Sequence, residues 1–197
     1  MDRNEENHMT RANEKLVSDL RFFDLLLQQF GGHEGELTMA IAYLTQAVGD
    51  DDPARKATLV RIARRKIRHA DILGSILLHL AKGSSGPLSK TMDQAALAEF
   101  LAQKGFTINY FDHAASTLNK LTAGGEQNSA LIHYSSSPRA YLTADILLED
   151  RQISVYSQLV SLTSEPSFIS ALNYAKYAQI QHREDLVDLR RRILIDL

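Results

Sequence analysis

The sequence predicts an all-α protein built as an antiparallel four-helix bundle. Three observations support this class. Apolar residues recur at steps of three and four along four long segments, three of the four prolines stand where such segments begin, and no stretch shows strand-like alternation. The chain has 197 residues, 44% hydrophobic and 23% charged, so we treat residues 1–197 as one domain with a sizeable core.

The first long helix is expected at residues 13–48, after a polar arm at residues 1–13. Glu34 fills the one gap in its apolar stripe, and Glu36 follows two residues later. Three glycines lie inside the segment: Gly31, Gly32 and Gly35. Each interior glycine costs a helix ~1 kcal/mol relative to alanine. Three together indicate close helix packing or a kink beside a site.

The second helix is expected from Pro53 to residue 82, with Asp52 as its N-cap. Residues 83–136 lack sustained periodicity and are rich in serine, glycine and asparagine, although residues 92–104 are typical of a short helix. We therefore interpret 83–136 as one long crossover connection between the second and third helices.

The third helix is expected to begin at Pro138, with Ser137 as its cap, and to present a stripe that runs from Leu142 through Ile153 to Val160. A turn at residues 164–167 separates it from the fourth helix, which is expected to end near residue 193. Short connections within each helix pair predict antiparallel neighbours.

Polar residues interrupt the middle of these apolar stripes. The second helix carries Lys66 and His69 among aliphatic residues, and the fourth carries Gln179 and His182 at the same spacing. A single core histidine is usually satisfied by hydrogen bonds within the core, but two helices with the same interruption favour a shared site. The third helix adds Glu149. Because a buried unpaired charge is costly, we expect these side chains to converge.

Four long helices with a long central crossover are typical of a ferritin-like bundle. In that architecture a dinuclear metal centre takes a Glu from each of two helices and a Glu-x-x-His motif from each of the other two. This chain has glutamates and histidines at the corresponding places, but Lys66 and Gln179 stand where the two motifs have Glu.

Four segments together resemble the manganese catalases, including their shorter bacterial and spore-coat relatives. GGHEGELTMAIAYLTQ (31–46) is similar to the family's G-G-x-x-G-E segment followed by Y-L-x-Q, and IARRKIRHAD (62–71) to its T-E-E-x-x-H-x-E segment. ADILLEDR (144–151) matches the ligand region of the third helix, and QIQH (179–182) matches the final E-x-x-H.

The resemblance implies four terminal metal ligands: Glu36, His69, Glu149 and His182. It also favours Glu36 over Glu34, which periodicity alone leaves open. Tyr43 either lines the cavity or belongs to the plain core, and both readings stay open.

Three departures from the family pattern cluster around the expected metals. The bridging glutamate falls on Lys66, the acid before the last histidine falls on Gln179, and an arginine that commonly precedes the third-helix glutamate falls on Leu148. A protonated lysine has three donors and no acceptor, so it cannot bridge two cations.

We therefore expect a manganese-catalase-like protein with an incomplete dinuclear site, holding one manganese ion or none and lacking strong catalase activity. No catalytic residue is assigned. Two alternatives stay open: a working manganese catalase that disproportionates hydrogen peroxide, and a structural or partner-binding helical bundle.

The net charge and the composition bear on the partners and the cellular location of the protein. A net charge of −2 argues against a general nucleic-acid binder, and the arginines between residues 55 and 68 are interpreted as a solvated face or an oligomer contact. There is no cysteine, no signal-peptide pattern at the N-terminus and no apolar run of the ~20 residues that a membrane span needs. We expect a cytoplasmic homo-oligomer with no nucleic-acid or membrane partner.

Overall fold

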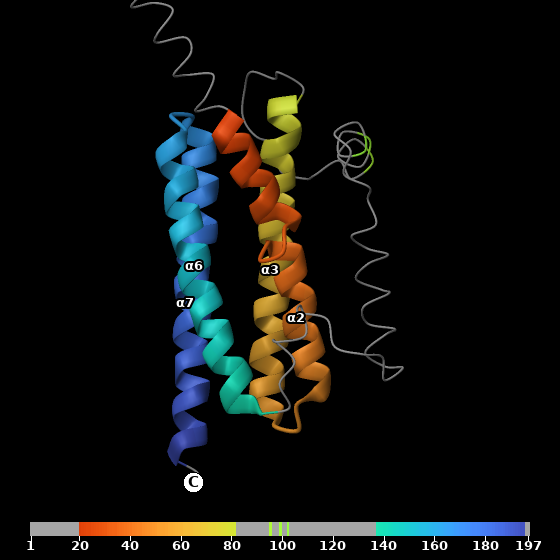
Figure 1. The fold of residues 1–197 in the computed structure, drawn as a ribbon, viewed down its shortest axis with the longest axis vertical. Helices are drawn as coiled ribbons and strands as arrows, with labels where there is room; N and C mark the ends of the chain where they lie inside the picture. Colours follow the sequence, from red (N-terminus) through yellow and green to blue (C-terminus); the bar gives the residue numbers. More distant parts are fainter. Residues whose placement is uncertain (1–19, 82–94, 96–98, 100–101, 103–136, 196–197) are drawn as a thin grey trace, which may run out of the picture.

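The computed structural model describes residues 20–81, 95, 99, 102 and 137–195. These residues include four complete long helices and no β-strand. They are α2 (Glu36–Gly49), α3 (Pro53–Ala81), α6 (Pro138–Leu162) and α7 (Pro166–Ile195). Residues 20–31 form a further helical segment before α2. In Figure 1, α2 and α3 lie side by side, α6 and α7 form the second pair, and the two pairs meet where α3 contacts α7. The predicted all-α bundle is confirmed, whereas the polar arm and nearly all of the crossover fall outside the described residues.

The prediction of one continuous first helix is wrong, because the helix is interrupted. Helix ends at residue 31, residues 32–35 form a turn, and α2 begins at Glu36. The glycines explain the interruption by close packing. A Cβ atom at Gly32 would lie 2.5 Å from the carbonyl oxygen of Gln28, and one at Gly35 would lie 2.7 Å from the same oxygen. The turn thus folds tightly onto the preceding helix and starts α2 in a new direction.

The predicted helix starts are confirmed at the prolines. Asp52 caps α3, since its Oδ1 accepts a hydrogen bond from the Arg55 backbone N–H at 2.7 Å. Ser137 occupies the N-cap position of α6, and its carbonyl accepts from the backbone N–H of Ala140 at 2.9 Å. Proline fits the first turn of a helix because the N–H it lacks would have no intrahelical partner there.

Asp50 ties the α2–α3 turn to the start of α6. Its carboxylate accepts two hydrogen bonds from the Arg55 guanidinium, each at 2.8 Å, and one from the Asp52 backbone N–H at 2.8 Å. The Tyr141 hydroxyl of α6 also donates to it. Bidentate arginine–carboxylate pairs fix orientation as well as distance, so this network sets the register between the two helix pairs.

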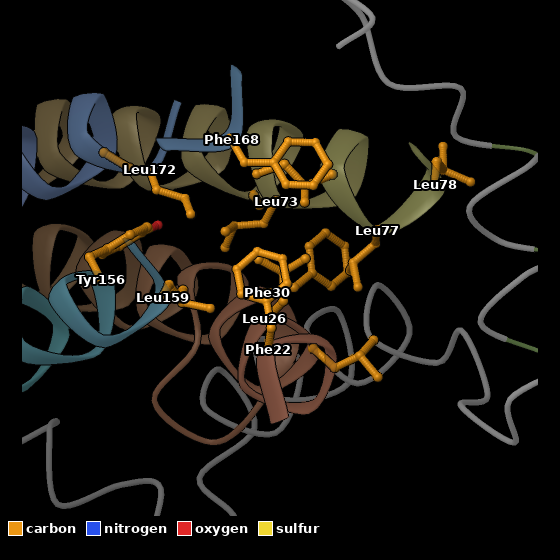
Figure 2. Close-up of a cluster of buried hydrophobic side chains, with 14 residues drawn as sticks. Phe22, Leu26, Phe30, Leu73, Leu77, Leu78, Tyr156, Leu159, Phe168 and Leu172 are labelled. Carbon is orange, nitrogen blue, oxygen red and sulfur yellow. The ribbon is translucent and has the colours of Figure 1, made fainter. Parts of the chain in front are cut away.

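Apolar side chains form two separate clusters. Figure 2 shows the first, in which Phe22, Leu26 and Phe30 face α3 and α7, with Tyr156 at one edge. The second cluster lies toward the other end of the bundle and includes Met39, Leu59, Leu142 and Leu186. None of the helices in the described ranges combines the length and apolar composition that a membrane crossing needs.

The buried face of α6 differs from the expected stripe. Ile153 and Val160 are only half-buried, whereas Asp145, Gln152 and Leu159 face the interior. The face is turned because α6 packs along α7 and also contacts the turn before α2. Two polar residues are thereby brought inside that the periodicity had not selected.

Candidate metal centre

Six polar side chains meet in the layer between the two apolar clusters, and each is at most 1% exposed. They come from all four long helices: Glu36 of α2, Lys66 and His69 of α3, Glu149 of α6, and Gln179 and His182 of α7. The structure thus brings together the polar residues that interrupt the stripes of the second, third and fourth helices, and it adds Glu36, which the resemblance favoured over the stripe residue Glu34. Whether four of them ligate metal is a separate question that stays a prediction.

The Lys66 ammonium lies at the centre of this cluster. Its Nζ is 2.9 and 3.0 Å from the two carboxylate oxygens of Glu149 and 3.7 Å from Oε2 of Glu36. It also donates to the amide oxygen of Gln179 at 2.6 Å and to that of Gln152. The ammonium is therefore enclosed by two carboxylates and two carboxamides, without contact to solvent.

Gln179 uses both ends of its amide. The oxygen accepts from Lys66 and lies 3.2 Å from Nδ1 of His182. The nitrogen donates to Glu36 and lies 3.3 Å from Nδ1 of His69. Because a carboxylate has no donor, an ionised glutamate at this position could not make the bond to Glu36.

Two tyrosines hold the glutamates in a reciprocal arrangement. The Tyr43 hydroxyl of α2 donates to Glu149 of α6 at 2.6 Å, and the Tyr156 hydroxyl of α6 donates to Glu36 of α2 at 2.5 Å. Each tyrosine follows the glutamate of its own helix by seven residues. Burial, with the neighbouring carboxylates, raises the pKa of both tyrosines well above its ordinary value. Tyr43 is thus a site residue and a core residue at once.

The pKa of both glutamates is lowered in this site. Burial by itself would raise the pKa of Glu36, but the charge of Lys66, together with His69 and the Tyr156 hydroxyl, outweighs burial and lowers this pKa to about 2. Burial likewise opposes ionisation of Glu149, and Lys66 again makes the largest contribution that lowers its pKa. The site is therefore an ion-pair network centred on Lys66.

The pKa of His182 is lowered in this site. Burial lowers its pKa more than the neighbouring Glu149 raises it. Its Nδ1 faces the Gln179 oxygen, and its Nε2 is buried with no hydrogen-bond partner. Oε2 of Glu36 likewise accepts no hydrogen bond, although it faces the Lys66 charge.

The family model for manganese containing catalase matches residues 12–188. The chain belongs to the manganese catalase family. The chain is also 24% identical to Protein CotJC of Bacillus subtilis (strain 168) over 157 residues, which cover 80% of this chain and 76% of that protein.

Solved structures of the family share the fold. The crystal structure of wild-type KatB, a manganese catalase from Anabaena, superposes with a TM-score of 0.61 at 22% identity, covering 88% of this chain and 72% of KatB. A second KatB structure, from Anabaena PCC7120, gives the same values. The expected ferritin-like bundle is thereby confirmed.

The donor set as arranged does not fit the pair of manganese ions implied by membership of the manganese catalase family. Across the described ranges, no three histidine, aspartate or glutamate side chains are grouped so that they could hold a metal ion. The reason lies in the centre of the cluster, where the Lys66 ammonium approaches both Glu36 and Glu149. A cation cannot share that space with an ammonium, since the two charges repel.

Two other residues weighed from the sequence lie away from the ionic cluster. The Glu34 side chain is 40% exposed and forms a bidentate pair with Arg151, at 2.8 and 2.9 Å. Leu148, which stands where manganese catalases commonly have arginine, packs into the second apolar cluster.

Gln152 and Asp145 were missed by sequence reasoning. Both lie on α6, three residues after and four residues before Glu149, so their helical spacing to that residue could have revealed them. Asp145 is fully buried and accepts a hydrogen bond from Gln46 at 3.1 Å. Burial, reinforced by the charge of Glu149, raises its pKa to about 8 despite the Gln46 bond. Asp145 is thus a buried acid beside the network that holds its proton more tightly than an ordinary aspartate does.

A cleft of about 420 Å³ opens beside the site. It is lined by residues of the 20–31 helix, the 32–35 turn and α6: Leu25, Gln28, Gln29, Gly32, His33, Glu34, Arg151, Gln152 and Val155. Two of these residues are buried and also touch the ionic cluster. Gln152 accepts from Lys66, and Gln29 approaches Oε1 of Glu36 at 3.5 Å.

Proposed function

We propose that this chain is a manganese-catalase-like protein whose dinuclear site is incomplete, so that it holds one metal ion or none and has no strong catalase activity. The observation that carries the proposal is the contact of the Lys66 ammonium with Glu149 and Glu36 in a fully buried layer. In this reading, the lysine supplies the positive charge that metal ions would otherwise supply to the two carboxylates.

The charge balance supports this reading. Two ionised glutamates without a counter-charge would be costly to bury, and one ammonium compensates much of that cost. Gln179 completes the arrangement, because its neutral amide accepts from Lys66 and donates to Glu36. A glutamate at this position would add a third negative charge without a second cation.

The chemistry of the lysine opposes the alternative of a working catalase. Manganese is bound by carboxylate and imidazole, and an ammonium has no lone pair to offer. A two-metal site would require Lys66 to leave its four partners, and its side chain is fully enclosed by them.

Metal content and oxygen evolution test the proposal. Purified protein is incubated with Mn²⁺, dialysed and assayed by elemental analysis, and oxygen release from hydrogen peroxide is followed with an electrode. We expect at most one manganese per chain and little oxygen. Two manganese ions per chain with rapid oxygen release would contradict the proposal and favour the working catalase.

A partner-binding role is the second candidate, and exposed apolar side chains support it. Tyr174 and Tyr177 of α7 are 59% and 65% exposed, and Leu147 of α6 is 54% exposed. Tyrosine is enriched at protein interfaces, so these side chains support a homo-oligomer. A cytoplasmic location is part of the same proposal. Sedimentation analysis and cell fractionation would test these two points.

A further inference from the structure

The turn at residues 32–35 lies beside the ionic cluster, because Gln152 contacts both the Glu34 backbone carbonyl and Lys66. It joins the 20–31 helix to α2 and leads directly into Glu36. Four hydrogen bonds tie its two glycines to the adjoining helices and to each other. The Gly32 N–H donates to the Gln28 carbonyl at 2.8 Å, and the Met39 N–H donates to the Gly35 carbonyl at 2.9 Å. The Gly35 N–H and the Thr38 hydroxyl both donate to the Gly32 carbonyl, at 2.9 and 2.8 Å. Glycine at both ends lets the turn lie close to the preceding helix, because a Cβ atom at either position would clash with the Gln28 carbonyl oxygen.

Two neighbouring residues of α6 hold the turn in place. On the outer side, Arg151 grips the Glu34 carboxylate with two hydrogen bonds, at 2.8 and 2.9 Å. On the inner side, the Gln152 amide nitrogen donates to the backbone carbonyl of Glu34 at 2.6 Å, while its oxygen accepts from Lys66. Glu34 is therefore held by its side chain on the outer side and by its backbone carbonyl on the inner side, and Gln152 connects the inner contact to the buried ammonium.

The cleft runs along this turn. His33 and Glu34 line it from the turn, and Leu25 and Val155 give it apolar walls. Gln152 also lines the cleft and accepts a hydrogen bond from Lys66. Since Glu34 and Arg151 neutralise each other, these walls suit a small uncharged solute better than an ion, which would have to shed its hydration.

We propose that residues 32–35 form a lid over the Lys66 cluster, latched by Arg151 outside and Gln152 inside, and that the cleft is the route by which small uncharged solutes reach Lys66.

Formaldehyde with a mild borane reductant, which dimethylates accessible amines, is a suitable small probe. Native protein is treated, and modification of Lys66 is timed by peptide mass spectrometry, with the exposed Lys56 as an internal standard. In parallel, residue-resolved hydrogen exchange follows the amides of Gly35 and Met39, which donate within and just after the turn at 2.9 Å. Breaking the outer latch with Arg151→Gln should accelerate both processes at least several-fold.

Arg183→Gln is the matched control. Arg183 of α7 pairs with Asp150, the neighbour of Arg151 on α6, and both side chains are exposed to a similar extent, 41% and 46%. The control should leave both rates at the wild-type level. Glu34→Gln removes the same ion pair from the other side and should reproduce Arg151→Gln, so it decides the question if Arg151→Gln does not fold. Unchanged rates in the latch variants, or equal acceleration in the control, would overturn the proposal.

Discussion

Lys66 and Glu149 form a buried ion pair that joins the two halves of the bundle, with the ammonium 2.9 and 3.0 Å from the two carboxylate oxygens. The lysine belongs to α3 and the glutamate to α6, and both side chains are fully enclosed. Breaking a buried pair by removing one partner is far more costly than the pair's net contribution, because the remaining charge loses its compensation.

Lys66→Met should therefore destabilise the protein by roughly 3–5 kcal/mol, as typical for the loss of one member of a buried pair. Denaturant unfolding monitored by circular dichroism measures the change. Lys56→Met on the exposed face of the same helix is the control, and it should stay within ~0.5 kcal/mol of wild type. Equal stability of the Lys66 variant and wild type would show that the ion pair does not support the fold.

Restoring the family's acids should restore dependence on metal. Lys66→Glu combined with Gln179→Glu places four carboxylates together, so the double variant should melt well below wild type in chelator. Mn²⁺ should raise its melting temperature strongly, since a ligand that binds only the folded state at 100 times its Kd stabilises by about 2.7 kcal/mol. The wild type should respond little, and a wild-type response of the same size would mean that Lys66 does not replace metal.

The loss of free energy of unfolding at acid pH should depend on Glu36. Its pKa falls from an ordinary 4.5 to about 2 in the folded protein, so the unfolded chain binds more protons between these values. The stabilising effect is complete above about pH 4.5 and is lost as the pH falls toward 2. Urea unfolding across this range should show a fall in the free energy of unfolding that is shallower in Glu36→Gln. Parallel curves for the two proteins would contradict the assignment.

Asp145 should have the opposite effect on the pH dependence of stability, because its contribution is lost as the pH rises. Its pKa rises from 3.8 to about 8 on folding, mainly through burial, so the folded state holds the proton more tightly. This contribution is greatest below pH 3.8 and is lost as the pH rises toward 8. Asp145→Asn keeps an oxygen for the Gln46 bond and cannot ionise, so its free energy of unfolding should fall less between pH 5 and 9. An identical fall in both proteins would show that Asp145 is not a buried acid.

The apolar periodicity, together with the prolines and caps at helix starts, predicted much of this fold. Prolines and the Asp52 cap fixed the helix starts, because these residues act locally. The glycines indicated close packing or a kink at this point, but a full interruption of the helix at residues 32–35 was not predicted, since apolar spacing continues without a break from Phe30 to Leu37. Only the close approach of Gly32 and Gly35 to Gln28 shows that the chain turns there, and that approach depends on tertiary packing.

The candidate site was predictable where charge interrupts an apolar stripe. Lys66, His69 and Glu149 stood out because such residues are rarely buried without partners. Gln152 and Asp145 did not stand out, since the extent of the α6 face that is buried depends on how that helix packs against α7 and the 32–35 turn. Which partners a buried lysine chooses is likewise a property of the assembled bundle.

The layering of the bundle has a consequence for the cooperativity of unfolding. Apolar contacts do not run unbroken from end to end, because the two hydrophobic clusters are divided by the layer that contains Lys66. The coupling between unfolding of the two clusters therefore depends on the backbones of the long helices and on the hydrogen bonds and charges of this layer. When those bonds are weakened, one end gains the freedom to melt before the other, and a single sharp transition gives way to two.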